Sequence, residues 1–281
     1  GMVITTGIQN TFVGSRSGVA TTDADFNVAF GVQALTTNVL GSQSTAIGTG
    51  ALATQNPSTA TNMLNTAVGF DAGVAVTTGI RNTLIGGLAG AVLTTGDTNT
   101  AVGRNSANAL TTATGNTFIG DNSGATITTG GNNTILGRYN GNQGGLNIRT
   151  TDNYIVLSDG NGNPNVFIDN GGLFHSAPTY GNTTSASANL VVESTGKFAR
   201  STSSLRYKNT VNNATHGLAE LMTLRPVTYK GNNDGDTVFG GLIAEEVHDA
   251  GLTEFVQYND DGEPDALAYG NMVSLCIKAI Q

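Results

Sequence analysis

Polar and apolar positions alternate in a short pattern that recurs through the first half of the chain: Asn-Thr-apolar-apolar-Gly, with small variations. Every interval between successive copies is 17 residues except one of 21, whose four extra residues lie around Pro57. Eight phased copies predict a repeat architecture, with Pro57 in an outward loop. The copies begin at Asn10, Asn27, Ser44, Asn65, Asn82, Asn99, Asn116 and Asn133.

Seventeen residues are too few for a helix pair or a propeller blade, but they suit one coil of a parallel β-roll or β-solenoid. Thr, Val and Ile form short strands and Gly closes each turn, so equivalent positions stack about 4.8 Å apart. We therefore predict a mainly β fold with a roll over residues 3–145. Each coil holds only two or three apolar side chains, such as Val68 or Ile85, which predicts a homotrimer sharing a central core.

One column of the roll carries Arg104, Asp121 and Arg138, spaced by 17 residues. Stacking predicts a ladder of alternating charge along three successive coils. A carboxylate in a groove can also hydrolyse glycans, which makes Asp121 a candidate acid. Two flanking arginines favour the ionised carboxylate, so the structural ladder is the preferred interpretation.

The repeat ends near Gly145, and residues 146–202 are interpreted as a hairpin and linker region. Residues 153–158 and 165–169 are expected to be strands joined by an Asn/Gly turn. Asp159 begins a pattern like that of a calcium loop, but Pro164 replaces its glycine, so no metal site is expected. His175 is interpreted as a solvated loop histidine.

The density of charged residues rises at residue 201. Residues 1–200 carry sixteen charged side chains, and the following 81 residues carry another sixteen. From 203 to 281 the pattern predicts a small α+β domain: a helix at 214–224, a strand at 225–230, a strand turning into a helix at 239–250, and a hairpin around Asp261-Gly262. The final helix places Tyr269, Met272, Val273, Cys276 and Ile280 on one face.

Composition narrows the function classes. Charged residues are 11% of the 281, and the net charge of −8 argues against nucleic acid as a partner. A single cysteine, Cys276, excludes an intrachain disulfide framework and a cysteine zinc site, and its apolar neighbours predict a buried thiol. No membrane insertion, cofactor or metal is expected. Gly1 before Met2 is interpreted as the scar of a cleaved tag.

The repeat over residues 7–141 resembles the head of trimeric autotransporter adhesins and the shafts of phage fibres. Both stack short Asn-to-Gly coils from three chains into a parallel β-roll. The resemblance concerns architecture and says nothing of a ligand.

Residues 203–281 resemble the intramolecular chaperone domain found at the C-terminus of phage tailspikes, endosialidases and neck appendages. The motifs that carry the likeness are SSLRYKNTV, LRPVTYK, GLIAEEV, YNDDGEPDALAY and LCIKAIQ. In that family the module trimerises the chain, drives the upstream fibre to fold, and cuts itself off. The resemblance implies Ser203 as nucleophile, Lys208 as general base, and cleavage between Thr202 and Ser203.

The chemistry requires a neutral lysine, which burial favours, to take the serine proton. Five residues on an unbroken helix turn side chains about 140° apart, so Ser203 is expected before a helix or in a turn. Ser204 is the nearest rival nucleophile. Glu245 and Glu246 are candidate supporting residues, and Arg206 is interpreted as structural or subunit-pairing.

These observations predict a virion protein, a phage tail-fibre or tailspike fragment that attaches to a host glycan or protein receptor. Its enzymatic activity is that of a single-turnover serine endopeptidase, cleaving only itself. A bacterial trimeric surface adhesin and a glycan-depolymerising tailspike are the alternatives.

Overall fold

The computed structural model describes residues 4–176, 190–192, 195–200 and 203–281. The chain forms two compact units, Gly1–Ser185 and Ala186–Gln281. The division falls inside the predicted hairpin and linker region.

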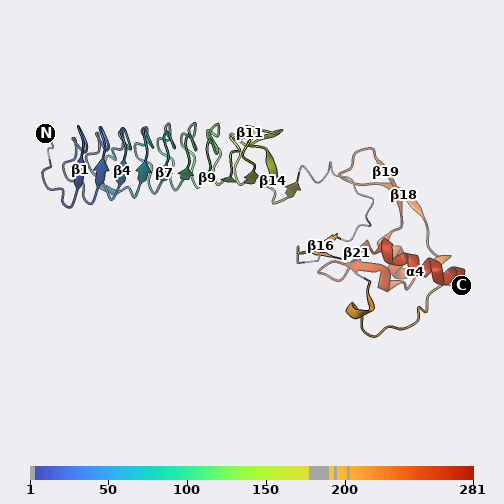
Figure 1. Cartoon of the computed structure of the whole chain (residues 1–281). Coiled ribbons are helices and arrows are strands. Elements are labelled where there is room, and N and C mark those ends of the chain that lie inside the picture. Colours follow the sequence, from blue (N-terminus) through green and yellow to red (C-terminus); the bar gives the residue numbers. More distant parts are fainter. Residues whose placement is uncertain (1–3, 177–189, 193–194, 201–202) are drawn as a thin grey trace. The chain divides into compact units, whose positions relative to one another are not determined.

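The first unit is a parallel β-solenoid, as the 17-residue repeat predicts. One three-residue strand of each coil pairs in parallel with the same strand of the next, and the partners match the repeat, as Thr83 with Thr100 and Ile85 with Val102. Figure 1 shows the coils stacked in a single row. The ladder strands are β1 (Thr11–Val13), β2 (Val28–Phe30), β4 (Thr45–Ile47), β6 (Thr66–Val68), β7 (Thr83–Ile85), β8 (Thr100–Val102), β9 (Thr117–Ile119), β10 (Thr134–Leu136) and β13 (Ile155–Ser158).

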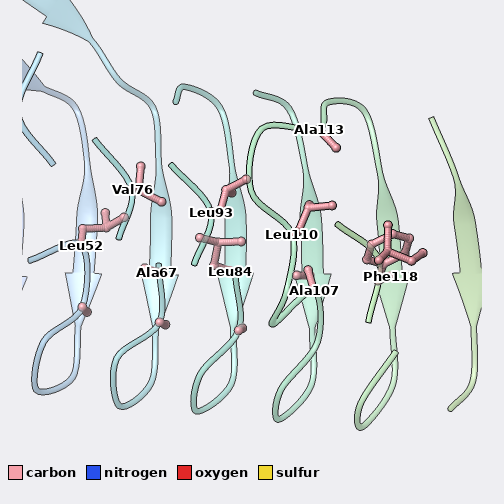
Figure 2. Packing of buried hydrophobic residues seen from close by; sticks show 14 of the residues in the cluster. Leu52, Ala67, Val76, Leu84, Leu93, Ala107, Leu110, Ala113 and Phe118 are labelled. Atoms are coloured by element: carbon pink, nitrogen blue, oxygen red, sulfur yellow. The ribbon is translucent and has the colours of Figure 1, made fainter. Parts of the chain in front are cut away.

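The core of the solenoid lies inside each coil. The middle residue of each strand points inward because side chains alternate across a strand. It meets apolar residues of the opposite wall, as Leu84 meets Leu93 of the same coil in Figure 2. The fully buried residues include Ala29, Leu35, Ala46, Leu52, Ala67, Val76, Leu84, Leu93, Ala101, Leu110, Phe118, Ile127, Ile135 and Val156.

Val68 and Ile85, which the sequence analysis names as apolar residues of the coils, do not belong to this buried core. Ile85 is 38% exposed and Val68 is half-buried, because the third strand position points away from the coil interior. A single chain therefore builds a continuous core of its own, and the prediction that thin coils need a shared core for burial was wrong in its physical reason.

Close stacking explains the glycine that ends each strand. Gly103 has a φ of +136°, a region that L-residues rarely adopt. A Cβ atom there would lie 2.2 Å from the carbonyl oxygen of Gly120 on the next coil. Coil spacing thus requires glycine at this column.

The asparagine that begins each motif is buried and links three coils. The Oδ1 atom of Asn99 accepts a hydrogen bond from the backbone N–H of Asn116 at 3.1 Å, and Asn82 does the same for Asn99 at 2.9 Å. The Nδ2 group of Asn99 donates to the carbonyl of Ala113 at 2.8 Å. The column satisfies buried backbone groups that strand pairing leaves unpaired.

One coil lacks this asparagine, and a second amide replaces it. At Ser44 the buried side chain of Gln55 donates to Ser44 Oγ at 3.1 Å and accepts from Asn65 Nδ2 at 3.0 Å. The four extra residues lie in the same coil. There β3 (Gly41–Ser42) pairs with β5 (Thr61–Asn62), residues 58–60 are exposed, and Pro57 is buried rather than outward.

Antiparallel strands follow the last coils. β13 pairs with β14 (Pro164–Ile168), β14 pairs with β15 (Phe174–Ser176), and a small hairpin joins β11 (Asn142–Gln143) to β12 (Leu146–Asn147). This confirms the predicted strands around the Asn/Gly turn, where Asp159 accepts two backbone N–H bonds.

The interpretation of His175 as a solvated loop residue was wrong. His175 belongs to β15, stacks on Phe167 with ring centroids 4.4 Å apart, and hydrogen-bonds Asp169 at 2.8 Å. The neighbouring strand β14 supplies the aromatic partner, which a linear sequence does not reveal.

The second unit is small and α+β. Its first elements are the hairpin of β16 (Leu190–Val192) with β17 (Phe198–Arg200), the 3₁₀ turn η1 (Leu205–Tyr207), and helix α2 (Leu218–Leu221). The others are β18 (Val227–Lys230), β19 (Val238–Gly241), α3 (Ala244–Asp249), η2 (Thr253–Phe255), β20 (Val256–Tyr258), β21 (Pro264–Leu267) and α4 (Tyr269–Ile280). A core of Val247, Leu252, Phe255, Val256, Met272 and Leu275 holds α3, η2, β20 and α4 together.

Two details of this unit differ from the sequence interpretation. The predicted helix at 214–224 is one turn, because α2 covers only Leu218–Leu221. On α4 the buried residues are Met272 and Leu275, whereas Cys276 is exposed and not the buried thiol that we expected. The exposed positions Tyr269, Val273, Ile277 and Ile280 lie on the rest of the helix surface. Within the described ranges, no helix is long and apolar enough to span a bilayer.

The asparagine ladder gives a first prediction. Asn99→Ala leaves the buried N–H of Asn116 and the carbonyl of Ala113 without their side-chain partner, so it should lower the free energy of unfolding by about 2–4 kcal/mol. Urea denaturation of the full chain at fixed concentration measures this. Asn62→Ala, an exposed amide, is the matched control and should change little. Equal midpoints for the two variants would contradict the role of the ladder.

A second prediction concerns pH. The hydrogen bond that protonated His216 donates from Nδ1 to Glu254 Oε1, 2.7 Å away, raises the pKa of His216 above its ordinary value of 6.5. Because the folded pKa is raised, the stability from this pair is fully present below about pH 6.5 and is lost as pH rises through the folded value. Glu254→Gln should therefore lower the melting temperature more at about pH 5.5 than at about pH 8. Glu263→Gln, an acid without a histidine partner among the described residues, should show no such difference.

Candidate functional site

The sequence-predicted dyad flanks the single turn of 3₁₀ helix, η1. Ser204 precedes the turn with extended backbone (φ −66°, ψ 139°), and Lys208 follows it, also extended (φ −121°, ψ 144°). Two backbone bonds close the turn: the N–H of Tyr207 donates to Ser204, and that of Lys208 donates to Leu205, both at 3.0 Å. The chain therefore reverses locally between Ser203 and Lys208.

The reversal brings the two side chains together. Lys208 Nζ lies 2.9 Å from Ser203 Oγ, at hydrogen-bond distance. A continuous α-helix would point residues five apart about 140° away from each other. One 3₁₀ turn with extended ends avoids this, and Ser203 lies before the turn, as the sequence argument required.

The pair has the geometry of a nucleophile and its base. A hydroxyl gains nucleophilicity when a neighbouring amine accepts its proton, and the heavy-atom distance for that transfer is the one seen here. Ser204 caps the turn without a side-chain hydrogen bond, and its Oγ is not joined to Lys208. Thr202, on the other side of the predicted cleavage site, lies outside the described residues.

Both members of the pair are exposed in the single chain. A lysine accepts a proton only as the neutral amine, and removal from water is what favours that form. In the single chain, the Ser203 hydroxyl and the Lys208 amine are thus within hydrogen-bond distance, but Lys208 is not buried as a neutral lysine base would need to be.

The three candidate supporting residues do not contact the dyad. Glu246 pairs with Arg225, whose Nε donates to Glu246 Oε2 at 3.2 Å. Glu245, its neighbour on α3, is exposed and has no cation partner in the described part of the chain. Arg206 lies over the ring of Tyr207, with the guanidinium carbon 5.2 Å from the ring centroid.

The second unit also has a surface hollow that the sequence did not predict. It has a volume of about 380 Å³ and lies among residues of β18, β21 and the starts of α3 and α4. Two carboxylates, Glu245 and Asp265, and two tyrosines, Tyr229 and Tyr269, line it. No spacing in the sequence links four elements in this way, and only the fold collects them.

The charge ladder on the solenoid is confirmed. Arg104 Nε lies 3.0 Å from Asp121 Oδ1, and Arg138 Nε lies 3.3 Å from Asp121 Oδ2. Asn122 Nδ2 also donates to Asp121 Oδ2 at 2.7 Å. The oxygens of Asp121 are thus engaged by two arginines and an amide of the solenoid, which supports the structural interpretation of this residue.

Beside the ladder runs an apolar column on the outer face of the strands. Its members occupy the third strand position of successive coils, and the most exposed are between 38% and 56% accessible. We call this the outer apolar column: Val13, Phe30, Ile47, Ile85, Ile119, Leu136 and Leu157.

The described residues contain no group of three or more His, Cys, Asp or Glu side chains that could hold a metal ion. No protein-family model, curated protein or solved structure matches the chain at a significant level. The fold and the site geometry are therefore the basis for what the chain can do.

Proposed function

We propose that the chain belongs to a homotrimeric fibre of the phage tail-fibre or tailspike type. The solenoid forms the shaft, which carries a host glycan or protein receptor-binding function in the virion. The second unit assembles three chains and then cuts the chain between Thr202 and Ser203. The 2.9 Å approach of Lys208 Nζ to Ser203 Oγ carries the cleavage part of the proposal.

The proposed cleavage proceeds in two steps. The neutral amine of Lys208 takes the hydroxyl proton of Ser203, whose Oγ attacks the carbonyl carbon of Thr202. The C–N bond breaks, the released amino group of Ser203 takes the proton back from Lys208, and an ester joins Thr202 to Oγ. Water then hydrolyses the ester, leaving a carboxylate on Thr202 and a free hydroxyl on Ser203. Each chain reacts once.

Exposure of the dyad supports a coupling of the cut to assembly. Because Lys208 is exposed in one chain, its amine is not shielded from water there. Packing of subunits around η1 would remove that water. We therefore assign the chemistry to the assembled fibre and not to a free chain.

The outer apolar column supports self-association of the shaft. A single coil stack already buries its inner residues, so the outward Val, Ile, Phe and Leu side chains are surplus to its own core. A contiguous apolar strip on a soluble protein marks an interaction surface. Three copies around a common axis would bury the strip equally, with equivalent coils side by side.

The cleavage proposal predicts two fragments. Intact mass measurement of the full chain, with a denaturing gel, should show residues 1–202 and 203–281. Ser203→Ala and Lys208→Ala should each remain uncut, because one removes the nucleophile and the other the base. The expected loss in rate is at least about a thousandfold.

Ser204→Ala is the matched control, since its hydroxyl does not contact Lys208, and it should cut at the same bond. Cutting of Ser203→Ala at an unchanged position would reject Ser203 as nucleophile.

The shaft proposal predicts that aspartate in the outer apolar column weakens assembly. Ile85→Asp combined with Ile119→Asp should raise the dissociation constant of the trimer by at least about a hundredfold, because two apolar contacts become buried charges. Light scattering over a concentration series measures this. Thr95→Asp with Thr112→Asp, exposed positions outside the strands, should leave the trimer intact. A folded wild-type monomer would contradict the proposal.

A further inference from the structure

The second unit carries two features of complementary charge. One is the turn η1 with Arg206, and the other is the hollow lined by Glu245, Asp265, Tyr229 and Tyr269. We propose that η1 of one copy docks into this hollow on a second copy, with Arg206 on the two carboxylates. The inference rests on the proposed assembly and names the surface that completes the cleavage site.

The walls of the hollow suit a side chain that is apolar along its length and charged at its tip. Leu242 and Leu267 add aliphatic surface to the two tyrosine rings. The Tyr269 hydroxyl is fixed at the rim, since it accepts from the N–H of Leu242 at 2.7 Å and lies 3.3 Å from the carbonyl of that residue. An arginine can place its methylenes on such walls and its guanidinium on carboxylates.

Three other acids of this unit already have cation partners. Glu246 pairs with Arg225, Asp236 with Lys230, and Glu254 with His216. Among the described residues, neither Glu245 nor Asp265 makes an ion pair or a side-chain hydrogen bond. Two carboxylates in one aromatic hollow without a cation are an incomplete charge arrangement.

The side chains of the turn η1 are also largely exposed to solvent. Leu205 is 72% exposed and Tyr207 is 58% exposed, and η1 has no buried residue. The hydrogen bonds and the cation–ring contact that the described structure gives for residues 203–208 lie within this segment. Arg206 has no carboxylate partner there. Apolar and basic side chains on η1 thus complement the apolar and acidic lining of the hollow.

The geometry of the turn separates the two cations. Arg206 lies inside the turn, whereas Lys208 follows it with an extended backbone. Arg206 can therefore reach the carboxylates while Lys208 stays on Ser203 Oγ. This matters because a carboxylate beside Lys208 would favour the ammonium form and oppose its action as a base.

A second copy is the occupant that the structure favours. The segment that fits the hollow is part of this chain, and large apolar residues of the same unit are also exposed, including Val273, Ile277 and Ile280 on α4. Self-association covers all of these surfaces together. Docking removes water from around η1, so a partner subunit supplies the burial that the single chain lacks.

Crosslinking tests the contact without using cleavage. The full chain carries Ser203→Ala to prevent cutting and Cys276→Ser to remove the native thiol, together with Arg206→Cys and Glu245→Cys. A short bismaleimide should join different copies, giving dimer and trimer bands on a denaturing gel. The control replaces Glu245→Cys by Asp249→Cys, an exposed residue at the other end of α3, and should give at least about fivefold less product.

Each other outcome overturns the inference. A linkage within one chain, found as an internal crosslink at monomer mass, would place η1 in its own hollow. Equal yields with the control, or no linkage in a sample that light scattering shows to be trimeric, would remove the contact. A monomeric sample that gives no linkage would reject the inference together with the proposed trimer. Cleavage of the wild-type chain is scored separately, so failure of the dyad and failure of the docking are distinguishable.

Charge exchange provides an independent measurement in the cleaving chain. Arg206→Glu and Glu245→Arg should each slow cleavage by about tenfold, and the double exchange should restore the rate to within about threefold of wild type. Arg206→Glu with Asp249→Arg should not restore it. Unchanged rates for both single variants would overturn the inference.

Discussion

The first unit depends on the buried amide of the asparagine that precedes most of its ladder strands. A parallel stack of three-residue strands is too short to hold its register by strand pairing alone, and the turns leave buried backbone groups unpaired. Each amide accepts from the next coil and donates across its own, as Asn99 does with Asn116 and Ala113. Where the asparagine is missing at Ser44, Gln55 supplies an amide from another part of the coil. The same contact thus maintains both the coil spacing and the register.

Register also bears on the proposed assembly of the shaft from three chains. Neighbouring repeats are nearly identical, so a slip of one coil between chains exchanges equivalent contacts and costs little. The outer apolar column offers the same surface at every coil and cannot specify the alignment by itself. A separate unit that joins three chains first would fix the alignment before the coils associate.

In the single chain, the Ser203–Lys208 pair lacks the burial that the proposed cleavage requires. A local turn brings Lys208 to 2.9 Å from Ser203, yet both remain in water. The acidic hollow and Arg206 are the surfaces that we propose to supply the missing cover. A cut that waits for a partner subunit would act only on chains that have already assembled, which follows from the dependence of a neutral lysine on burial.

The sequence by itself determined the solenoid, because each 17-residue period carries its own strand, turn glycine and buried asparagine, and these signals are local. It also indicated the Ser203–Lys208 pair, whose members are five residues apart and are brought together by one turn. Only the tertiary structure decided which apolar residues enter the core: Ile85 faces out and Cys276 is exposed, since the face that a strand or helix buries depends on what packs against it. Likewise, His175 stacks on Phe167 of the neighbouring strand, and Glu245 and Asp265 line one hollow from separate elements. Such contacts join residues whose separation along the chain has no fixed period, so no pattern in the sequence marks them.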